Sequence, residues 1–285
     1  MVTRLIDIHP HIISPDTERY PISPLGGKRS SWSEEHPATF EELIKAMDEA
    51  GVDKAAIVHS STTYGYDNSY VADAIAAHPE RFDGVFSVDI LADDAPQKID
   101  YWARDRQLGG LRIFTTGSTM RGQAPILNDA RIHPGWRAAG EAGLPICAQI
   151  TAAAIPDLEK LLQQYPDFPV IIDHMLKPDI SEGPPYDKAR PMLSLARYPN
   201  VYLKMTDRNT VMAKEGKATP QSWFGLVVKE FGANRIAWGS NWPSSDGTLA
   251  EIAQDLRDSI AFLPAEDQHW IMAGTAMKLY PRLAD

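Results

Sequence analysis

Two histidines near the start of the chain have the spacing that most directly indicates chemistry. Residues 7–11 read Asp-Ile-His-Pro-His, and alternate residues of an extended strand point to the same side. Asp7, His9 and His11 are therefore expected to share one face. A neutral imidazole nitrogen binds zinc, and an imidazolium neutralises a developing oxyanion. A His-x-His pattern often occurs by chance. Here it indicates a site more strongly, because it lies at the end of an apolar run.

A third histidine ends another apolar run, over residues 170–174 (Val-Ile-Ile-Asp-His). Strand alternation places His174 on the same side as Val170 and Ile172. If both runs are strands of one parallel barrel, their carboxyl ends open at the same mouth, and the three histidines converge there. The alternative is a core histidine, which needs a hydrogen-bond partner of its own.

The elements that must position these side chains are eight short apolar runs separated by amphipathic stretches. This alternation is typical of repeated β-α units around a parallel sheet. In one amphipathic stretch, Thr39 and Glu42 have the spacing of a helix capping box. The sequence predicts a (β/α)₈ TIM barrel that forms a single domain over residues 1–285. The expected strands are residues 5–9, 55–59, 84–88, 110–114, 145–150, 170–174, 201–205 and 236–240.

The composition excludes several classes of partner. Hydrophobic residues make up 44% of the chain and charged residues 23%, which is typical of a soluble globular protein. The formal net charge of −10 disfavours nucleic acid and anionic membranes as partners. No run of about 18 apolar residues predicts a transmembrane helix, so a cytoplasmic location is expected. A lone cysteine, Cys147, excludes an internal disulfide and a cysteine-rich metal site.

A long segment after the first strand, residues 12–37, falls on the catalytic face of the expected barrel. Segments of this length without obvious secondary structure are often functional. Lys28, Arg29 and Trp32 are placed to reach over the pocket. The alternative is a surface lid that does not contact the substrate.

Polar side chains at the ends of other runs are candidates for substrate binding. A guanidinium at Arg112 can hold a carboxylate through two hydrogen bonds. Gln149 can bind a carbonyl or satisfy backbone groups, and Lys204 can contact the substrate or extend to the barrel rim. Trp242 forms an apolar wall or packs in the core. Gly239, just before it, permits close approach of a ligand or of neighbouring backbone.

Three motifs, in this order, resemble the amidohydrolase-2 branch of the amidohydrolase superfamily, and in particular its 2-pyrone-4,6-dicarboxylate lactonase-like group. They are Asp-x-His-x-His from Asp7, Ile-Asp-His-Met-x-Lys-Pro-Asp around His174, and Trp-Gly-Ser-x-Trp-Pro from Trp238. The resemblance extends from Asp7 to Tyr280. It implies a hydrolase that opens a lactone by water attack, in aromatic compound catabolism.

The resemblance also identifies one departure. The family carries an aspartate at the position of Asn241, where it acts as general base or metal ligand. An amide accepts no proton at neutral pH, so Asn241 impairs the activation of water. The residue is either a natural variant whose chemistry does not need this base or an engineered change from aspartate.

The resemblance implies that Lys177 and Arg208 stand where the lactonase-like group binds a dicarboxylate, and that Arg112 matches the arginine of its fourth strand. The alternative for Lys177 and Arg208 is surface pairing with Asp179 or Asp207. An anionic small molecule is therefore the expected partner, and a homodimer is compatible with a barrel of this size.

The superfamily commonly uses one or two divalent ions, whereas the lactonase-like group is thought to work without one. We expect no metal, with Zn or Mn held by His9, His11 and His174 as the alternative. The predicted reaction is hydrolysis of a carboxylate-bearing lactone, in which the histidines stabilise the oxyanion and residue 241 handles the proton. The alternatives are a metal-dependent decarboxylase or amide hydrolase on the same barrel, and a binding protein that lost its base through Asn241.

Overall fold

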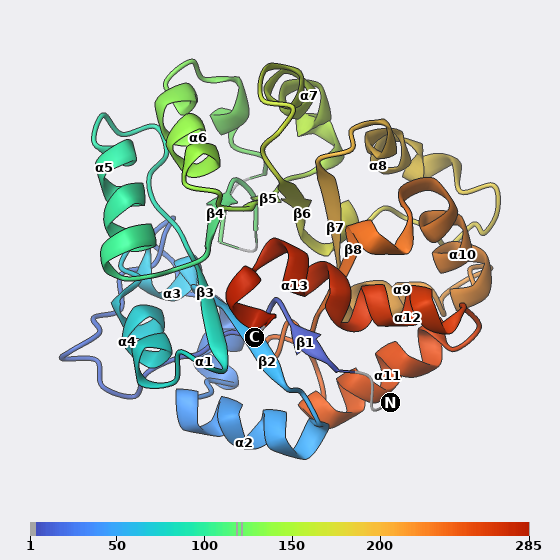
Figure 1. Cartoon of the computed structure of the whole chain (residues 1–285), viewed down its shortest axis with the longest axis horizontal. Helices are drawn as coiled ribbons and strands as arrows, with labels where there is room; N and C mark the ends of the chain where they lie inside the picture. The colour runs from blue at the N-terminus through green and yellow to red at the C-terminus, as the bar shows by residue number, and fades with distance from the viewer. Residues whose placement is uncertain (1–3, 118, 121, 285) are drawn as a thin grey trace.

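The computed structural model describes residues 4–117, 119–120 and 122–284. Eight parallel strands form one sheet in chain order, and helices surround it (Figure 1). The strands are β1 (Ile6–Asp7), β2 (Lys54–Val58), β3 (Phe82–Phe86), β4 (Gly110–Phe114), β5 (Ile146–Gln149), β6 (Val170–Ile172), β7 (Val201–Thr206) and β8 (Ile236–Gly239).

The last strand returns to the first. The Ile8 amide, just beyond β1, donates a hydrogen bond of 3.1 Å to the carbonyl of Trp238 on β8. Each of the eight apolar runs overlaps one observed strand. The predicted (β/α)₈ barrel is therefore confirmed.

The helices outside the barrel present one apolar stripe to it. At the start of α2 (Phe40–Ala50), Thr39 and Glu42 form the predicted capping box, with the Glu42 carboxylate accepting from the Thr39 amide at 2.7 Å. Phe40, Leu43 and Met47 of this helix are buried in the hydrophobic core. The outer helices are α2 (Phe40–Ala50), α4 (Ser69–Ala77), α5 (Ala95–Asp100), α6 (Ile132–Glu141), α7 (Ile155–Gln164), α8 (Arg190–Leu193), α10 (Pro220–Phe231) and α11 (Leu249–Ile260).

Successive residues of a strand face two different apolar clusters. On β6, Val170 and Ile172 belong to the large outer cluster that packs against the helices. Ile171, between them, belongs to an inner cluster inside the barrel. This alternation decides which side chains can reach a site in the barrel interior.

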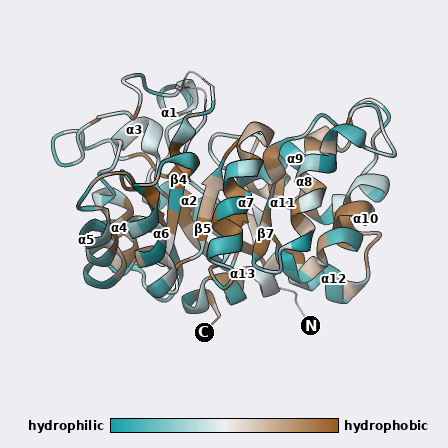
Figure 2. Ribbon diagram, turned by 90° about the horizontal axis from the view of Figure 1, so that it is seen from above, coloured by the Kyte–Doolittle hydropathy of each residue, from teal (hydrophilic) through white to brown (hydrophobic). Residues whose placement is uncertain are grey.

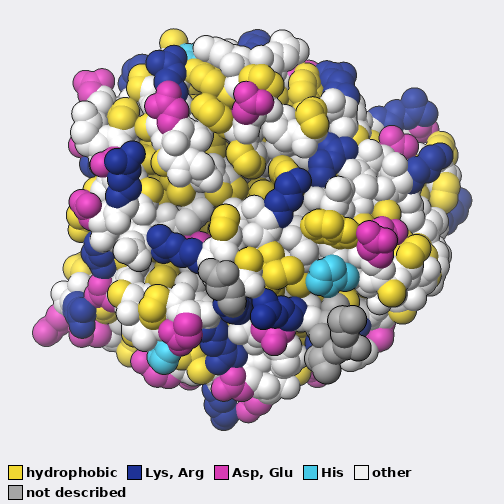
Figure 3. All heavy atoms as spheres, in the orientation of Figure 1, with side chains coloured by type: hydrophobic (Ala, Val, Ile, Leu, Met, Phe, Trp, Pro, Cys, Tyr) yellow, Lys and Arg dark blue, Asp and Glu magenta, His cyan; other side chains and the backbone are white. Residues whose placement is uncertain are grey.

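The two ends of the barrel differ. Ala276 and Tyr280, in and just after α13 (Thr275–Leu279), pack with Ile6 and Val85 in the inner cluster. Figure 2 shows α13 and α12 (Ala265–His269) at the end that holds both termini, with α1 (Ser31–Glu35), α3 (Ser61–Tyr64) and α9 (Asp207–Met212) at the opposite end. The end closed by α13 carries acidic and basic side chains dispersed among hydrophobic ones (Figure 3).

A site in the interior is therefore reached from the end that carries α1, α3 and α9. Across the residues that the structure describes, no helix is long and apolar enough to cross a membrane.

Candidate active site

The first strand ends sooner than the alternation argument assumes. β1 stops at Asp7, and Ile8 packs with Ile6 in the inner cluster. Asp7 Oδ1 accepts backbone hydrogen bonds from His9 at 2.9 Å and from Ser240 at 2.8 Å. Burial raises the pKa of Asp7 to about 6. Asp7 thus ties the first strand to the eighth, and the prediction that it shares one face with both histidines is wrong.

The three histidines do come together. The ring centroid of His9 lies 4.9 Å from that of His11 and 4.8 Å from that of His174. All three are at most 5% exposed. A Cβ added to Gly239 would lie 2.5 Å from His9 Cβ, so the predicted close approach at this glycine is made by the neighbouring segment.

His174 reaches the cluster by a route that the sequence does not indicate. Strand β6 ends at Ile172, and His174 opens a left-handed turn with φ of 52°. The next three residues, through Lys177, also have positive φ. This conformation is uncommon for non-glycine residues. Because the turn re-aims the chain, His174 faces inward although Val170 and Ile172 face outward, so the predicted shared side is wrong.

Hydrogen bonds define the tautomers of two rings. His11 Nδ1 lies 2.7 Å from the carbonyl oxygen of Val58, which can only accept, so Nδ1 carries the proton. His174 Nδ1 lies 3.0 Å from the Thr206 hydroxyl, whose own proton points to Asn209 Oδ1.

Both rings are neutral at physiological pH. Burial lowers the pKa of His11 to about 3 and lowers the pKa of His174 well below its ordinary value. With the proton on Nδ1, the Nε2 atom of each ring presents a lone pair. His11 and His174 are therefore acceptors, whereas oxyanion stabilisation needs donors.

Beneath the histidines lies a buried group of charges that we call the charge triad: Arg112, Asp173 and Lys204. Arg112 Nε donates to Asp173 Oδ2 at 2.8 Å, and Lys204 Nζ lies 2.8 Å from Asp173 Oδ1. Burial alone would raise the pKa of Asp173, but the two cations outweigh it and hold that pKa well below its usual range. Arg112 also donates to the side chain of Gln149.

A cavity opens above this group. His11, His174, Arg112 and Gln149 form part of its wall, and Asn241 lines it from the end of β8. Among the described residues around it, none carries a carboxylate.

The remaining wall comes from loops and short helices. Lys177 and Arg208 add two exposed cations, and burial together with Arg208 lowers the pKa of Lys177. Trp32 of α1 stacks on His11, with ring centroids 5.2 Å apart and an angle of 28° between the ring planes. The prediction that residues 12–37 reach over the pocket is confirmed for Trp32. Arg29 instead bonds Ser33 within its own segment.

Asn241 has φ of 60°, a left-handed conformation that asparagine tolerates better than most residues. Its Nδ2 donates to Ser245 Oγ at 2.8 Å. The amide oxygen is therefore the atom left for the cavity. It can accept a hydrogen bond and cannot remove a proton at neutral pH.

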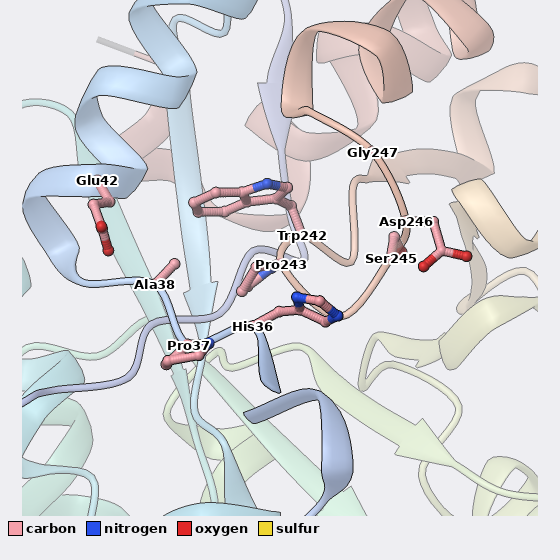
Figure 4. A pocket seen from close by; sticks show the side chains of 9 residues that line it. All are labelled: His36, Pro37, Ala38, Glu42, Trp242, Pro243, Ser245, Asp246 and Gly247. Atoms are coloured by element: carbon pink, nitrogen blue, oxygen red, sulfur yellow. The ribbon is translucent and has the colours of Figure 1, made fainter. Parts of the chain in front are cut away.

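Two of the predicted substrate contacts lie elsewhere. Lys204 is completely buried in the charge triad and does not line the cavity, so it does not extend to the barrel rim. Trp242 lines a separate pocket with His36, Glu42 and Asp246 (Figure 4). His59, just after β2, has its Nε2 2.9 Å from the carbonyl oxygen of Gly65.

The residue that sequence reasoning missed is Asp173. Its signal was available, since it directly precedes His174 and follows Ile171 by two positions, on the inward parity of β6. Its two cationic partners are 61 and 31 positions away in the sequence, and no local pattern connects them to it.

The donor set does not fit a metal ion. Within the described part of the chain, no three His, Cys, Asp or Glu side chains converge as a metal site. Asp173, whose Oδ1 lies 3.9 Å from His9 Nδ1, has each oxygen facing a cation. His11 and His174 do offer lone pairs, but a dication would stand next to the positive charges of Arg112 and Lys204.

Related proteins of known structure do bind metals. An amidohydrolase from Burkholderia multivorans with bound zinc has a TM-score of 0.75 at 18% identity, over 98% of this chain and 99% of that chain. A dihydroxybenzoic acid decarboxylase from Polaromonas sp. JS666 with bound manganese has a TM-score of 0.70 at 16% identity, over 98% and 97%. The fold can thus hold a metal, and these likenesses concern the fold alone.

Other comparisons point to hydrolases. The amidohydrolase family model matches residues 6–282. An L-fucono-1,5-lactonase from Burkholderia ambifaria is 28% identical, over 72% of this chain and 70% of its own. A 4-sulfomuconolactone hydrolase from Rhizobium radiobacter is 23% identical, over 96% and 89%. A Pseudomonas putida protein named for a proposed 2-pyrone-4,6-dicarboxylic acid hydrolase activity has a TM-score of 0.77 at 21% identity, over 99% of both chains.

Proposed function

The chain belongs to the amidohydrolase family, and on that premise we propose that it hydrolyses a lactone bearing a carboxylate, without a divalent metal ion. Relatives along most of the chain are named for opening lactones. The observation that carries the proposal is a cavity with neutral histidine acceptors on one wall and cations on another.

Each wall has a distinct task in this reaction. The Nε2 atoms of His11 and His174 hold the attacking water as hydrogen-bond acceptors. Its oxygen bonds to the lactone carbonyl carbon, and the negative charge moves to the carbonyl oxygen. That charge is stabilised by the guanidinium of Arg112, because the Nε2 atoms of His11 and His174 carry no proton to donate to it. The water passes one proton to His174 Nε2 as its oxygen bonds to the carbonyl carbon. The ring C–O bond then breaks, and that proton moves to the ring oxygen to give a hydroxy acid.

The substrate carboxylate fits the outer cations. Lys177 and Arg208 lie at the mouth, away from the ion pairs of the charge triad. Among the described residues, the Arg208 guanidinium has one distant hydrogen-bond partner, Ser244 Oγ at 3.5 Å, so it can turn toward a ligand. Removing the negative charge from the substrate should therefore weaken binding.

Position 241 limits the rate. Asn241 can orient a water or a substrate hydroxyl through its amide oxygen, but it cannot remove a proton. The same observation favours a second candidate, a protein that binds the lactone without turning it over. Aspartate at this position separates the two, since a binding protein stays inert when the base is supplied.

The first test is hydrolysis of a panel of lactones by the chelated protein, with His174→Ala as the disabling variant. Loss of an acceptor for the water should lower kcat by about 10²-fold or more. His133→Gln, outside the cavity, is the matched control and should retain turnover. Undiminished turnover by His174→Ala would remove the site assignment.

The cytoplasmic location and the homodimer expected from the sequence stay predictions. Cell fractionation tests the first, and light scattering of the purified protein tests the second.

A further inference from the structure

The charge triad is unbalanced. Asp173 supplies one negative charge, whereas Arg112 and Lys204 supply two positive charges. The side chains of Asp173 and Lys204 are completely buried, and that of Arg112 is 6% exposed. Lys204 Nζ also lies 3.7 Å from Cys147 Sγ, a weak acceptor. The charge triad by itself therefore carries one net positive charge. A further buried carboxyl near it is Asp7, whose pKa is raised by burial and lowered by the charge of Lys204.

The charge triad lies directly against the histidine cluster. His9 Nδ1 is 3.9 Å from Asp173 Oδ1, the same oxygen that faces Lys204. Neither ring nitrogen of the fully buried His9 has a hydrogen-bond partner among the described residues. Burial lowers the pKa of His9 well below its ordinary value, and the positive charge of Lys204 lowers it further. The ring nitrogens thus face a space that already contains positive charge.

We propose that Lys204 is a fixed internal cation that keeps a divalent ion out of the cluster of His9, His11 and His174 and supplies positive charge there in its stead. The inference rests on the proposed function only for its metal-independent chemistry. A dication would have to approach an ammonium through a medium of low dielectric constant, where repulsion is strong. Asp173, whose Oδ1 lies 3.9 Å from His9 Nδ1, is engaged by a cation on each oxygen.

Lys204 touches no part of the cavity, so it acts through other groups. Its ammonium fixes Asp173, which in turn holds Arg112 at the cavity wall. Lys204 is therefore a positioning residue. Lys204 should control whether the histidine cluster binds a metal ion. A lysine with only a structural role would not do so.

The test is a titration with Co²⁺, whose visible absorption reports coordination by protein ligands. The wild-type protein should bind no stoichiometric Co²⁺. Lys204→Met, which removes the charge but keeps an unbranched chain, should bind one equivalent at least about a hundredfold more tightly. Lys204→Arg keeps the charge and should behave as the wild type. Lys177→Met, which removes a cation at the cavity mouth, is the matched control and should also stay free of Co²⁺.

Two results would overturn the proposal: stoichiometric micromolar binding by the wild type, or no gain in a folded Lys204→Met protein. Circular dichroism establishes folding, and Lys204→Gln replaces the methionine variant if that variant fails to fold. The titration needs no turnover. A protein without lactonase activity that gains Co²⁺ on loss of Lys204 would refute the proposed function and leave this inference standing.

Discussion

The floor of the cavity and its mouth are built in opposite ways. The floor is the charge triad, whose members come from β4, β7 and the end of β6 and are almost completely buried. The mouth carries Lys177 on a left-handed turn and Arg208 in the first turn of α9, and both are exposed. Cations occupy both places, but only the floor pairs them with a carboxylate.

The difference separates two tasks. Buried residues on strands hold a charge in a fixed position. This suits the chemical step, which is the same for every substrate. Exposed cations on turns and short helices can adapt to a ligand and set its specificity. Substitutions in the floor should therefore change stability and the state of the histidines, and substitutions at the mouth should change the choice of substrate.

The largest effect is expected from Asp173→Asn. It leaves Arg112 and Lys204 buried without their counterion, which should lower the free energy of unfolding by about 3–5 kcal/mol. Urea unfolding measures the change. Asp207→Asn is the control at the mouth, where burial already raises the pKa of the carboxyl, and it should change stability by less than about 1 kcal/mol. Equal losses of unfolding free energy in both variants would contradict the proposed difference between the floor and the mouth.

Acid should act on the buried histidines that lie against the floor. The pKa of His11 is lowered to about 3, and those of His9 and His174 are lowered well below 6.5. Below pH 6.5 the unfolded chain therefore binds protons that the folded chain refuses, and stability falls as pH falls. Asp7, with its pKa raised to about 6, opposes this trend because its folded form takes up a proton first.

Burial also raises the pKa of Asp83 and Asp207, which therefore act in the same direction as Asp7. His59, whose pKa burial lowers to about 4, adds to the histidines, which outnumber these three carboxyls. Between pH 6.5 and 5.5 the net loss should be about 3 kcal/mol. Urea unfolding at several pH values measures it, and a flat profile across this window would mean that these rings are not held neutral by the fold.

At the mouth, Lys177→Ala and Arg208→Ala should raise KM for a carboxylate-bearing lactone by about tenfold to a hundredfold, as expected for a lost hydrogen bond to a charged group. The free energy of unfolding should stay within about 0.5 kcal/mol of the wild type. A neutral lactone is the control substrate and should be unaffected. The same rise in KM for both substrates would show that the cations at the mouth do not recognise the negative charge of the substrate.

The smallest effect is expected for Trp32, the aromatic residue that stacks on His11. Trp32→Ala removes the ring stacked on His11 and should lower kcat/KM about twofold to tenfold. Trp242→Ala is the matched variant, because this indole lines the separate pocket beside Glu42. It should leave KM unchanged, and a larger kinetic effect there than at Trp32 would reverse the two assignments.

The barrel could be predicted because its signal is local. Each strand is a short apolar run, and the capping box of α2 lies within four residues. The convergence of His9, His11 and His174 followed from the rule that parallel strands open at one end. These predictions depend only on the spacing of apolar residues along the sequence and on the order of the strands and helices.

The rest of the site depends on contacts between residues that are far apart in the sequence, and no local pattern predicts these contacts. The left-handed turn that redirects His174 contains no glycine to announce it. The burial of Lys204 follows from its meeting with Asp173, a residue of another strand end. The role of His11 as an acceptor follows from a bond to the carbonyl of Val58. Long-range pairing therefore decides what each predicted site residue can do.

The most direct test of the proposed hydrolysis compares the chelated wild-type protein with Asn241→Asp on carboxylate-bearing lactones, with metal content recorded. A carboxylate at this position supplies the missing base, so kcat should rise by about 10²–10⁴-fold with little change in KM. If both proteins leave every lactone intact, the cavity does not perform this reaction and the account of its chemistry is wrong.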